Sequence, residues 1–276
     1  MRVLITGGSG YLGRYLVPLA MQKAEAVVHT YYSSAPPGAM GARRLDVRDA
    51  NAVMELVTDF EPDVIIHAAG SSGRTTMAEV IGRGAKHITA AAAHTGARLI
   101  HLSTDVVFDG RRAPYKEDDA PRPLHEYGRA KARAEAIVRR HTNHVIVRTS
   151  LIYGLQEIDH GTAWILDGLR QGDSVTLFTD QIRNPVWAVS LSNACLELAA
   201  LHYRGILHVA GSQILTRAQF GLRMLDWWGI IERATLSLGT GDGERWPADC
   251  SLDISRAQRL LQTPLPGVDE VLKMHR

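Results

Sequence analysis

A tyrosine and a lysine stand four residues apart in the stretch HEYGRAK, at Tyr127 and Lys131. On a helix, residues i and i+4 share a face, so the two side chains can converge on one pocket. A free phenol titrates at about 10, and a nearby ammonium favours the phenolate and lowers that pKa. Such a tyrosine can act as a general acid or base, which is worth ~10²–10⁴ in rate. The alternative is a solvated helix face, and the surrounding chain decides between the two.

A group of polar residues follows an apolar run further upstream. The segment LSTDVVFDG places Ser103, Thr104 and Asp105 at the carboxyl end of a strand expected over Ala97–Ser103. Ligands of open α/β sheets bind at this edge. Thr104 can donate a hydrogen bond to a substrate oxygen without becoming charged, whereas the simpler alternative is a turn that ends the strand.

A glycine-rich turn lies near the start of the chain. In TGGSGYLG, the residues Gly7, Gly10 and Gly13 fit G-x-x-G-x-x-G between an apolar run and a helical pattern. Glycine permits the tight turn, lets the backbone approach a pyrophosphate, and lets helix and strand pack closely. The helix N-terminus then offers N–H groups and a positive dipole end to the anion. The turn predicts nucleotide binding, and a purely steric need for glycine is the alternative.

The elements that must position these residues alternate through the first half of the chain. Short apolar runs predict strands, and amphipathic stretches between them predict helices. The expected strands are Arg2–Thr6, Ala26–Thr30, Asp63–Ala69, Ala97–Ser103 and Val145–Thr149, and the expected helices are Tyr11–Lys23, Ala50–Phe60, Met77–Thr95 and Leu124–Arg140. Near-continuous apolar strands suit burial on both faces. The alternation predicts an α/β fold with a doubly wound parallel sheet, the Rossmann fold.

The pattern loosens after residue 150. We predict a dinucleotide-binding domain over residues 1–150, with its sheet completed by segments from about 174–210. Residues 151–276 are expected to form mainly a small C-terminal α/β lobe that binds substrate. The legible elements there are a helix near Ala163–Gly172, a strand at Ser174–Thr179, a helix at Ser190–Leu201 and a strand at Ile206–Ala210.

Composition argues against several function classes. The formal net charge of +2 and scattered basic residues predict no nucleic-acid partner. Two cysteines, Cys195 and Cys250, favour a reducing compartment over a disulfide framework. Neither a signal peptide nor a membrane span of ~18–20 apolar residues is expected, so the protein is predicted to be cytoplasmic. The histidines lack metal-ligand spacing, and no metal site is expected.

The end of the second strand bears on the choice of cofactor. It reads HTYYSS and lacks the carboxylate that holds a ribose 2′-hydroxyl in NAD binders. Ser33 and Ser34 leave room for a 2′-phosphate, with Arg43 or Arg44 as counter-charges. NADP(H) is therefore favoured over NAD(H), which stays open.

Together these residues resemble the extended short-chain dehydrogenase/reductase superfamily. Within it, the likeness is to the dTDP-4-dehydrorhamnose reductase family of sugar-nucleotide reductases, and it covers nearly the whole chain. The motifs that carry it are TGGSGYLG, LDV (45–47), PDVIIHAA (62–69), LSTDVVFDG (102–110), YGRAK (127–131), RTSLIYG (148–154), DQIRNP (180–185) and GILHVAG (205–211).

The resemblance implies that hydride passes from the nicotinamide to a keto carbon of a nucleotide-linked sugar. It implies that Tyr127 supplies the proton, that Thr104 orients the carbonyl, and that Lys131 holds the ribose and tunes Tyr127. The implied cofactor-binding residues are Gly7, Gly10, Tyr11, Leu12, Gly13, Thr30, Asp46, Val47, Ala68, Ala69, Gly70, Ser103, Tyr127 and Lys131. The implied substrate-binding residues are Thr104, Asp105, Leu151 and Arg183. A nucleotide sugar is the expected partner, and a homodimer is the oligomer considered.

Several positions depart from the pattern of the reductases. The segment 71–79 reads SSGRTTMAE for T-x-V-D-x-A-E, Ile81 replaces an asparagine, Leu151 a tryptophan, Arg183 a glycine and Val186 a threonine. All are expected on the substrate side or in support of the catalytic helix. Arg183 could hold a substrate phosphate, because a guanidinium suits bidentate anion contacts, and a solvated surface arginine is the equal alternative. The departures suggest a different sugar, or a relative that binds the cofactor but has drifted in catalysis.

Two rival functions remain open. One is a sugar-nucleotide epimerase or 4,6-dehydratase of the same superfamily, in which the nicotinamide is reoxidised within one turnover. The other is a non-catalytic, cofactor-binding regulatory subunit of the kind found in methionine adenosyltransferase.

Overall fold

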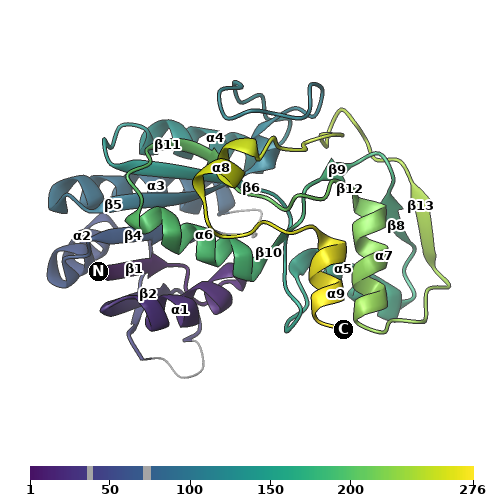
Figure 1. Cartoon of the computed structure of the whole chain (residues 1–276), viewed down its shortest axis with the longest axis horizontal. Helices are drawn as coiled ribbons and strands as arrows, with labels where there is room; N and C mark the ends of the chain where they lie inside the picture. Colours follow the sequence, from purple (N-terminus) through teal and green to yellow (C-terminus); the bar gives the residue numbers. More distant parts are fainter. Residues whose placement is uncertain (36–39, 71–75) are drawn as a thin grey trace.

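The central feature of the fold is a seven-stranded sheet, and the computed structural model describes residues 1–35, 40–70 and 76–276 (Figure 1). Its strands are β1 (Arg2–Thr6), β2 (Ala26–Tyr31), β3 (Ala42–Arg44), β4 (Val64–His67), β5 (Arg98–Thr104), β6 (His144–Thr149) and β11 (Gly205–His208). They lie in the order β11-β6-β5-β4-β1-β2-β3, and every neighbouring pair is parallel.

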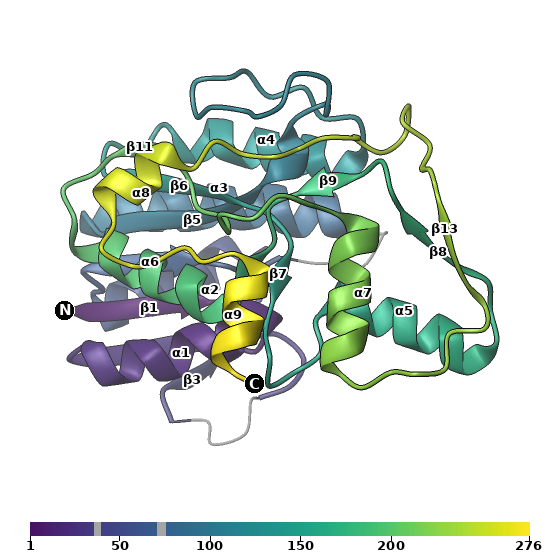
Figure 2. The same ribbon diagram turned by 45° about the vertical axis from the view of Figure 1, so that its right-hand side comes forward.

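Helices cover both faces of the sheet (Figure 2). One face packs against α2 (Ala50–Phe60), α3 (Met77–Thr95) and α4 (Glu126–Val138), and the other against α1 (Tyr11–Lys23) and α6 (Ala188–Ala200). Successive strand residues point to opposite faces, so in β1 the side chain of Leu4 joins one core cluster and that of Ile5 the other. This double burial explains the near-continuous apolar strands.

The predicted fold class, an α/β fold with a doubly wound parallel sheet, is confirmed. The helices Tyr11–Lys23, Ala50–Phe60 and Met77–Thr95 begin and end at the predicted residues. The fourth helix begins at Glu126, two residues later than predicted, because the His125 side chain accepts a hydrogen bond from the Gly128 N–H and caps it there.

The C-terminal half contributes to the sheet and also forms separate small elements. The strand expected at Ile206–Ala210 is β11, which extends the sheet beside β6. The strand expected at Ser174–Thr179 is β8 (Val175–Phe178), which pairs outside the sheet with β13 (Leu236–Gly239). The remaining elements are η1 (Asp105–Val107), β7 (Ile152–Tyr153), α5 (His160–Gln171), β9 (Ile182–Arg183), β10 (Val186–Trp187), β12 (Leu215–Thr216), α7 (Arg217–Trp227), α8 (Ser255–Leu260) and α9 (Val268–Met274).

The order of the strands fixes where a ligand can bind. From β1 the chain adds β2 and β3 on one side of the sheet, and β4, β5 and β6 on the other. A crevice therefore opens beyond the carboxyl ends of β1 and β4, which is where such sheets bind ligands. Among the described helices, none has the length and apolar character to cross a membrane.

Candidate active site

A crevice of about 1070 Å³ runs along this edge of the sheet and continues between α5, β8 and α7. It collects nearly all the predicted site residues: Gly7, Gly10, Tyr11, Leu12, Thr30, Asp46, Val47, Ala68, Ala69, Gly70, Ser103, Thr104, Asp105, Tyr127, Lys131, Leu151 and Arg183 line it. Gly13 lies outside the lining. Residues that are distant in the sequence thus share one continuous space.

The glycine turn forms a cradle that larger residues would fill. Gly7 has a φ of +77°, and a Cβ there would lie 2.8 Å from the backbone of Ala69. A Cβ on Gly13 would lie 2.4 Å from the carbonyl oxygen of Gly8. Gly10 is the N-cap of α1, and no side chain among the described residues caps that helix. The N-terminus of α1 can therefore face a pyrophosphate, as dinucleotide binding requires.

Two of the predicted cofactor residues use their polar groups to hold the scaffold. Thr30 accepts hydrogen bonds from the Gly8 N–H at its carbonyl oxygen (2.8 Å) and from the Gly7 N–H at Oγ1 (3.3 Å). The Ser103 hydroxyl donates to Oε1 of Glu135 at 2.5 Å. Both residues line the crevice, but these bonds make them supports for the glycine turn and for the end of β5.

Tyr127 and Lys131 both reach the crevice from α4. The Nζ of Lys131 donates to the carbonyl oxygen of Leu102 at 2.9 Å. Burial lowers the pKa of Lys131 to about 8, with Glu135 opposing this shift. The pKa of Tyr127 is raised to about 12, first by burial and then by the carboxylate of Asp105. The expected lowering of the phenol pKa is therefore wrong for this structure, because desolvation of the phenolate prevails.

Asp105 lies at the centre of a buried polar cluster beside Thr104. It accepts hydrogen bonds from Thr104 Oγ1 at 3.1 Å and from Ser150 Oγ at 2.6 Å, and Nε of Arg183 lies 3.6 Å from its carboxylate. Burial raises the pKa of Asp105, while Arg183 and the two hydroxyls oppose the rise. Thr104 can donate to a substrate carbonyl once its hydrogen rotates away from Asp105.

Arg183 is held by the protein on all sides of its guanidinium. Besides Asp105, its Nη1 donates to the carbonyl oxygens of Ile182 and Ala248, both at 2.7 Å, and its Nη2 donates to that of Pro247 at 2.9 Å. A substrate phosphate would have to displace these bonds. The geometry therefore favours a structural role for Arg183 over the suggested phosphate contact.

Arg217 was not among the residues predicted from the sequence, and its guanidinium, unlike that of Arg183, is not held by hydrogen bonds to the described residues. It begins α7 and lines the crevice between the lobe elements. Its guanidinium makes no hydrogen bond or ion pair with any residue in the described ranges, and burial lowers its pKa. The carboxylates of Asp105 and Asp159 attract this guanidinium without forming an ion pair with it, so its hydrogen-bond donors are left for an anionic ligand. No motif spacing could have found it, because it lies far along the chain from Tyr127.

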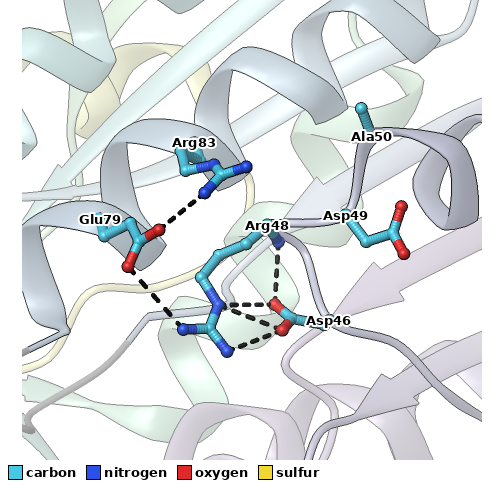
Figure 3. A pocket seen from close by; sticks show the side chains of 6 residues that line it. All are labelled: Asp46, Arg48, Asp49, Ala50, Glu79 and Arg83. Atoms are coloured by element: carbon cyan, nitrogen blue, oxygen red, sulfur yellow. Dashed lines mark hydrogen bonds and ion pairs between the residues drawn. The ribbon is translucent and has the colours of Figure 1, made fainter.

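The adenosine end of the crevice also differs from expectation. Arg43 and Arg44 are exposed residues of β3 and do not line the crevice. Arg48 does, and its guanidinium forms an ion pair with Asp46 at 2.7 Å (Figure 3). In the sequence, Arg48 could have been recognised as a site residue by its position two residues after Asp46, an implied cofactor-binding residue. The carboxylate of Asp46, one of the implied cofactor-binding residues, is thus already paired with an arginine.

The departures from the reductase pattern lie in three kinds of place. Leu151 lines the crevice. Ile81 is 2% exposed and packs in the cluster that holds α3 against α4, which agrees with support of the catalytic helix. Val186 is fully buried in the other main cluster and does not line the crevice, so of the two expected places it does not take the one on the substrate side. Residues 71–75 of the SSGRTTMAE segment lie outside the described residues.

The model of one protein family, described as the RmlD substrate binding domain, matches residues 1–274. The chain belongs to this family. The sequence resemblance to dTDP-4-dehydrorhamnose reductases is thereby confirmed, and this RmlD-family chain is an NAD(P)-dependent oxidoreductase.

The relatives of this RmlD-family chain include a protein named as a reductase and proteins named as a subunit of methionine adenosyltransferase. It is 29% identical to the probable low-salt glycan biosynthesis reductase Agl14 of Haloferax volcanii, over 99% of this chain and 96% of the relative. It is 31% identical to methionine adenosyltransferase 2 subunit beta of Xenopus tropicalis, over 83% of this chain and 72% of the relative.

Solved structures share the architecture of the RmlD-family chain over its whole length. A hypothetical dTDP-4-dehydrorhamnose reductase from Sulfolobus tokodaii superposes with a TM-score of 0.82 at 29% identity, covering 99% of both chains. The dTDP-4-dehydrorhamnose reductase of Bacillus anthracis, solved in complex with NADP, has the same fold, with a TM-score of 0.79 at 22% identity over 99% and 96% of the chains.

The pKa of Lys131 predicts a pH dependence for this RmlD-family chain. The ammonium is present below about 8 and is lost as pH rises through that value. If the charge holds the ribose and stabilises phenolate, kcat/KM for the reduced cofactor should fall above that pH, because this ratio reports the free enzyme. Tyr127, with a pKa of about 12, does not titrate in this range. A profile recorded from about pH 6 to 10 that stays flat or rises would contradict the assignment.

Proposed function

We propose that this chain is an NAD(P)H-dependent reductase that transfers hydride to a keto group of a nucleotide-linked sugar. One observation carries the proposal: a single crevice joins the glycine cradle, the pair of Tyr127 and Lys131, and the unpaired guanidinium of Arg217. Its volume of about 1070 Å³ lies just above the ~300–1,000 Å³ usual for small-molecule sites. It therefore suits two extended ligands placed end to end.

The residues divide the chemistry between them. The reduced nicotinamide, when bound, supplies the hydride. Tyr127 Oη donates its proton to the keto oxygen, and its raised pKa keeps the phenol protonated at neutral pH until then. Lys131 lies on the same helix and stabilises the phenolate that the transfer leaves. Thr104 directs its hydroxyl to the same oxygen, and Asp105 and Ser150 hold the end of β5 in place.

The substrate end of the crevice supports a phosphate-bearing ligand. Arg217 has no partner among the described residues, whereas Asp159, an acid in the lining, caps α5 through the N–H groups of Gly161 and Thr162. Trp164 is 53% exposed and offers an aromatic surface in the same lining. We infer that residues 151–276 form most of the substrate lobe and that Arg217 holds the substrate's phosphate.

Replacing Arg217 with alanine should raise KM for the sugar nucleotide by about tenfold to a hundredfold, with a smaller change in kcat. The phosphate contact is uniform binding, present in both the ground and the transition state. Arg223→Ala is the matched control, because Arg223 lies on the same helix but pairs with Asp269 outside the crevice. An unchanged KM in Arg217→Ala, measured by steady-state kinetics, would exclude this role.

The proposed reaction has a direct test. We expect the purified chain to oxidise NADPH with at least one keto-sugar nucleotide in a panel, with one mole of alcohol formed per mole of cofactor consumed. An epimerase or dehydratase would convert a sugar nucleotide without net consumption of cofactor. Conversion of that kind would replace the reductase assignment by the first rival.

The finer choice of cofactor rests on the end of β2. NADP(H) is favoured there because Tyr31, Tyr32 and Ser33 line the crevice without a carboxylate, and Arg48 lies beside Tyr32. NAD(H) remains the alternative. We further propose a cytoplasmic location, which suits the two buried free thiols, Cys195 and Cys250. A homodimer remains a prediction.

A second candidate function is a regulatory subunit that keeps the cofactor site. The 31% identity to methionine adenosyltransferase 2 subunit beta favours it. Co-purification with a second chain, together with no turnover across the whole panel, would support this candidate. The presence of Thr104, Tyr127 and Lys131 in one crevice supports the reductase.

A further inference from the structure

Four charged residues close the adenosine end of the crevice, and the proposed reaction gives them no task. Asp46, Arg48, Glu79 and Arg83, which we call the charged ring, line a small pocket of about 430 Å³ together with Asp49 and Ala50. Two come from the turn that precedes α2 and two from the first turns of α3 (Figure 3). Asp46 and Arg48 also line the main crevice, so the ring lies where a bound cofactor would end.

Arg48 is shared between two carboxylates. Its Nε and Nη2 donate to Oδ1 and Oδ2 of Asp46 at 2.9 and 2.7 Å, and its Nη1 lies 3.9 Å from Oε2 of Glu79. Glu79 is itself paired with Nη1 of Arg83 at 2.7 Å. The side chains of Arg48 and Asp46 are 23% and 33% exposed, and those of Glu79 and Arg83 are more exposed still. The Arg48–Asp46 pair is bidentate, but water reaches both of its side chains and screens the attraction, and the pairs of Glu79 are more exposed still.

The other side of Arg48 faces the end of β2. Its guanidinium lies 5.6 Å from the ring centroid of Tyr32, and Nη2 donates to the Tyr32 hydroxyl at 3.1 Å. Tyr32 and Ser33 follow β2 directly and line the crevice. In Rossmann folds the adenosine ribose binds at this strand end, where an acid recognises a 2′-hydroxyl or an arginine a 2′-phosphate. Arg48 is the arginine in that position here.

We propose that Arg48 selects the cofactor by exchanging its carboxylate partners for a 2′-phosphate, and that Asp46 and Glu79 limit this selection by competing for the same guanidinium. The proposal rests on the proposed function, because it assumes that a dinucleotide occupies the crevice. A 2′-phosphate offers a bidentate, doubly charged partner that outweighs a weak exposed pair. A 2′-hydroxyl cannot compete, so with NAD(H) the pair between Arg48 and Asp46 remains closed.

The charged ring predicts that substitutions at Glu79 and Arg83, both on α3, have opposite effects on the binding of a 2′-phosphate by Arg48. Removing the charge of Glu79 frees Arg48 for the phosphate. Removing Arg83 leaves Glu79 without its nearer partner, so Glu79 turns its charge on Arg48 and on the incoming phosphate. Asp46 stays ionised at neutral pH, because its hydrogen bonds with Arg48 lower its pKa. The competition therefore persists under ordinary assay conditions.

The test measures binding of two probes to the full chain by calorimetry: adenosine 2′,5′-bisphosphate, which carries the phosphate, and 5′-ADP, which lacks it. The quantity compared is the ratio of the two dissociation constants. Arg48→Ala should reduce the preference for the bisphosphate by at least about tenfold. Glu79→Gln should increase it by about threefold or more, and Arg83→Ala should decrease it by a similar factor. Arg43→Ala, an exposed arginine outside the lining, is the matched control.

An unchanged ratio in Arg48→Ala would overturn the proposal, as would equal and same-direction shifts in Glu79→Gln and Arg83→Ala. Arg48→Lys, which keeps the charge but loses the bidentate fork, provides a second variant if the alanine variant does not fold, and it should show an intermediate ratio. If the unaltered chain binds neither probe, the dinucleotide site itself is refuted, and the proposed function fails with the selection. Binding of both probes with an unchanged ratio refutes the selection alone.

Discussion

Replacing Tyr127 with phenylalanine is expected to lower kcat by at least ~10² while leaving the affinity for the reduced cofactor nearly unchanged. The substitution removes the hydroxyl that donates the proton and keeps the ring that packs beside the core on α4. With no other donor in place, the alkoxide that forms on hydride transfer must take its proton from water. Turnover with a keto-sugar nucleotide and cofactor binding by fluorescence titration measure the two quantities separately.

The control removes a phenol elsewhere. Tyr203→Phe deletes a hydroxyl that donates to the carbonyl oxygen of Ile206 and lies outside the crevice, so its turnover should match that of the unaltered chain. Equal activity in Tyr127→Phe would remove Tyr127 as the proton donor. Loss of cofactor binding in the same variant would show that the Tyr127 hydroxyl also holds the cofactor, because the substitution keeps the ring.

The direction of the Tyr127 shift has a consequence for the direction of the reaction. A phenol with a pKa of about 12 is protonated at neutral pH, which is the form that reduction needs. Oxidation of an alcohol would need the phenolate, which burial and the Asp105 carboxylate disfavour. The described residues thus hold Tyr127 in the protonated form that keto reduction uses near neutral pH.

Local sequence signals predicted the scaffold of the site well. Hydrophobic periodicity and helix ends depend on neighbouring residues, so Tyr11–Lys23 and Met77–Thr95 could be placed to the residue. The glycine turn was equally legible, because Gly7 must adopt a positive φ against the backbone of Ala69. The parallel character of the sheet then followed from the alternation of strands and helices.

The interactions that set charge and affinity could not be read in this way. Arg183 is held by carbonyl oxygens of Pro247 and Ala248, which only the folded chain brings to it. Arg217 is recognised as unpaired only when its surroundings are known. The pKa of Tyr127 depends on how far its hydroxyl is buried, a property of the packed helix that the spacing to Lys131 does not encode. The spacing in the sequence identified Tyr127 and Lys131, whereas their packing in the fold determines their protonation states.

The ion pair between Glu135 and Arg148 is expected to be the most costly single contact to break beneath the site. The two side chains are 3% and 1% exposed, and Arg148 donates to both oxygens of Glu135, from Nε at 3.0 Å and from Nη2 at 2.8 Å. Glu135→Ala should lower the free energy of unfolding by about 3–5 kcal/mol, because it leaves a buried guanidinium without its counter-charge. Denaturant unfolding followed by circular dichroism measures this change.

Two comparisons separate the lost pair from lost packing. Replacing both partners with methionine should recover part of the stability, because the buried guanidinium is removed together with its counter-charge, while Lys131 still loses the nearby Glu135 carboxylate. Arg223→Ala, which breaks an exposed ion pair with Asp269, should cost no more than about 1 kcal/mol. The Ser103 hydroxyl also donates to Glu135, so the pair holds the end of β5 beside Thr104. A Glu135→Ala protein of unchanged stability would contradict the stabilising role given to this buried pair.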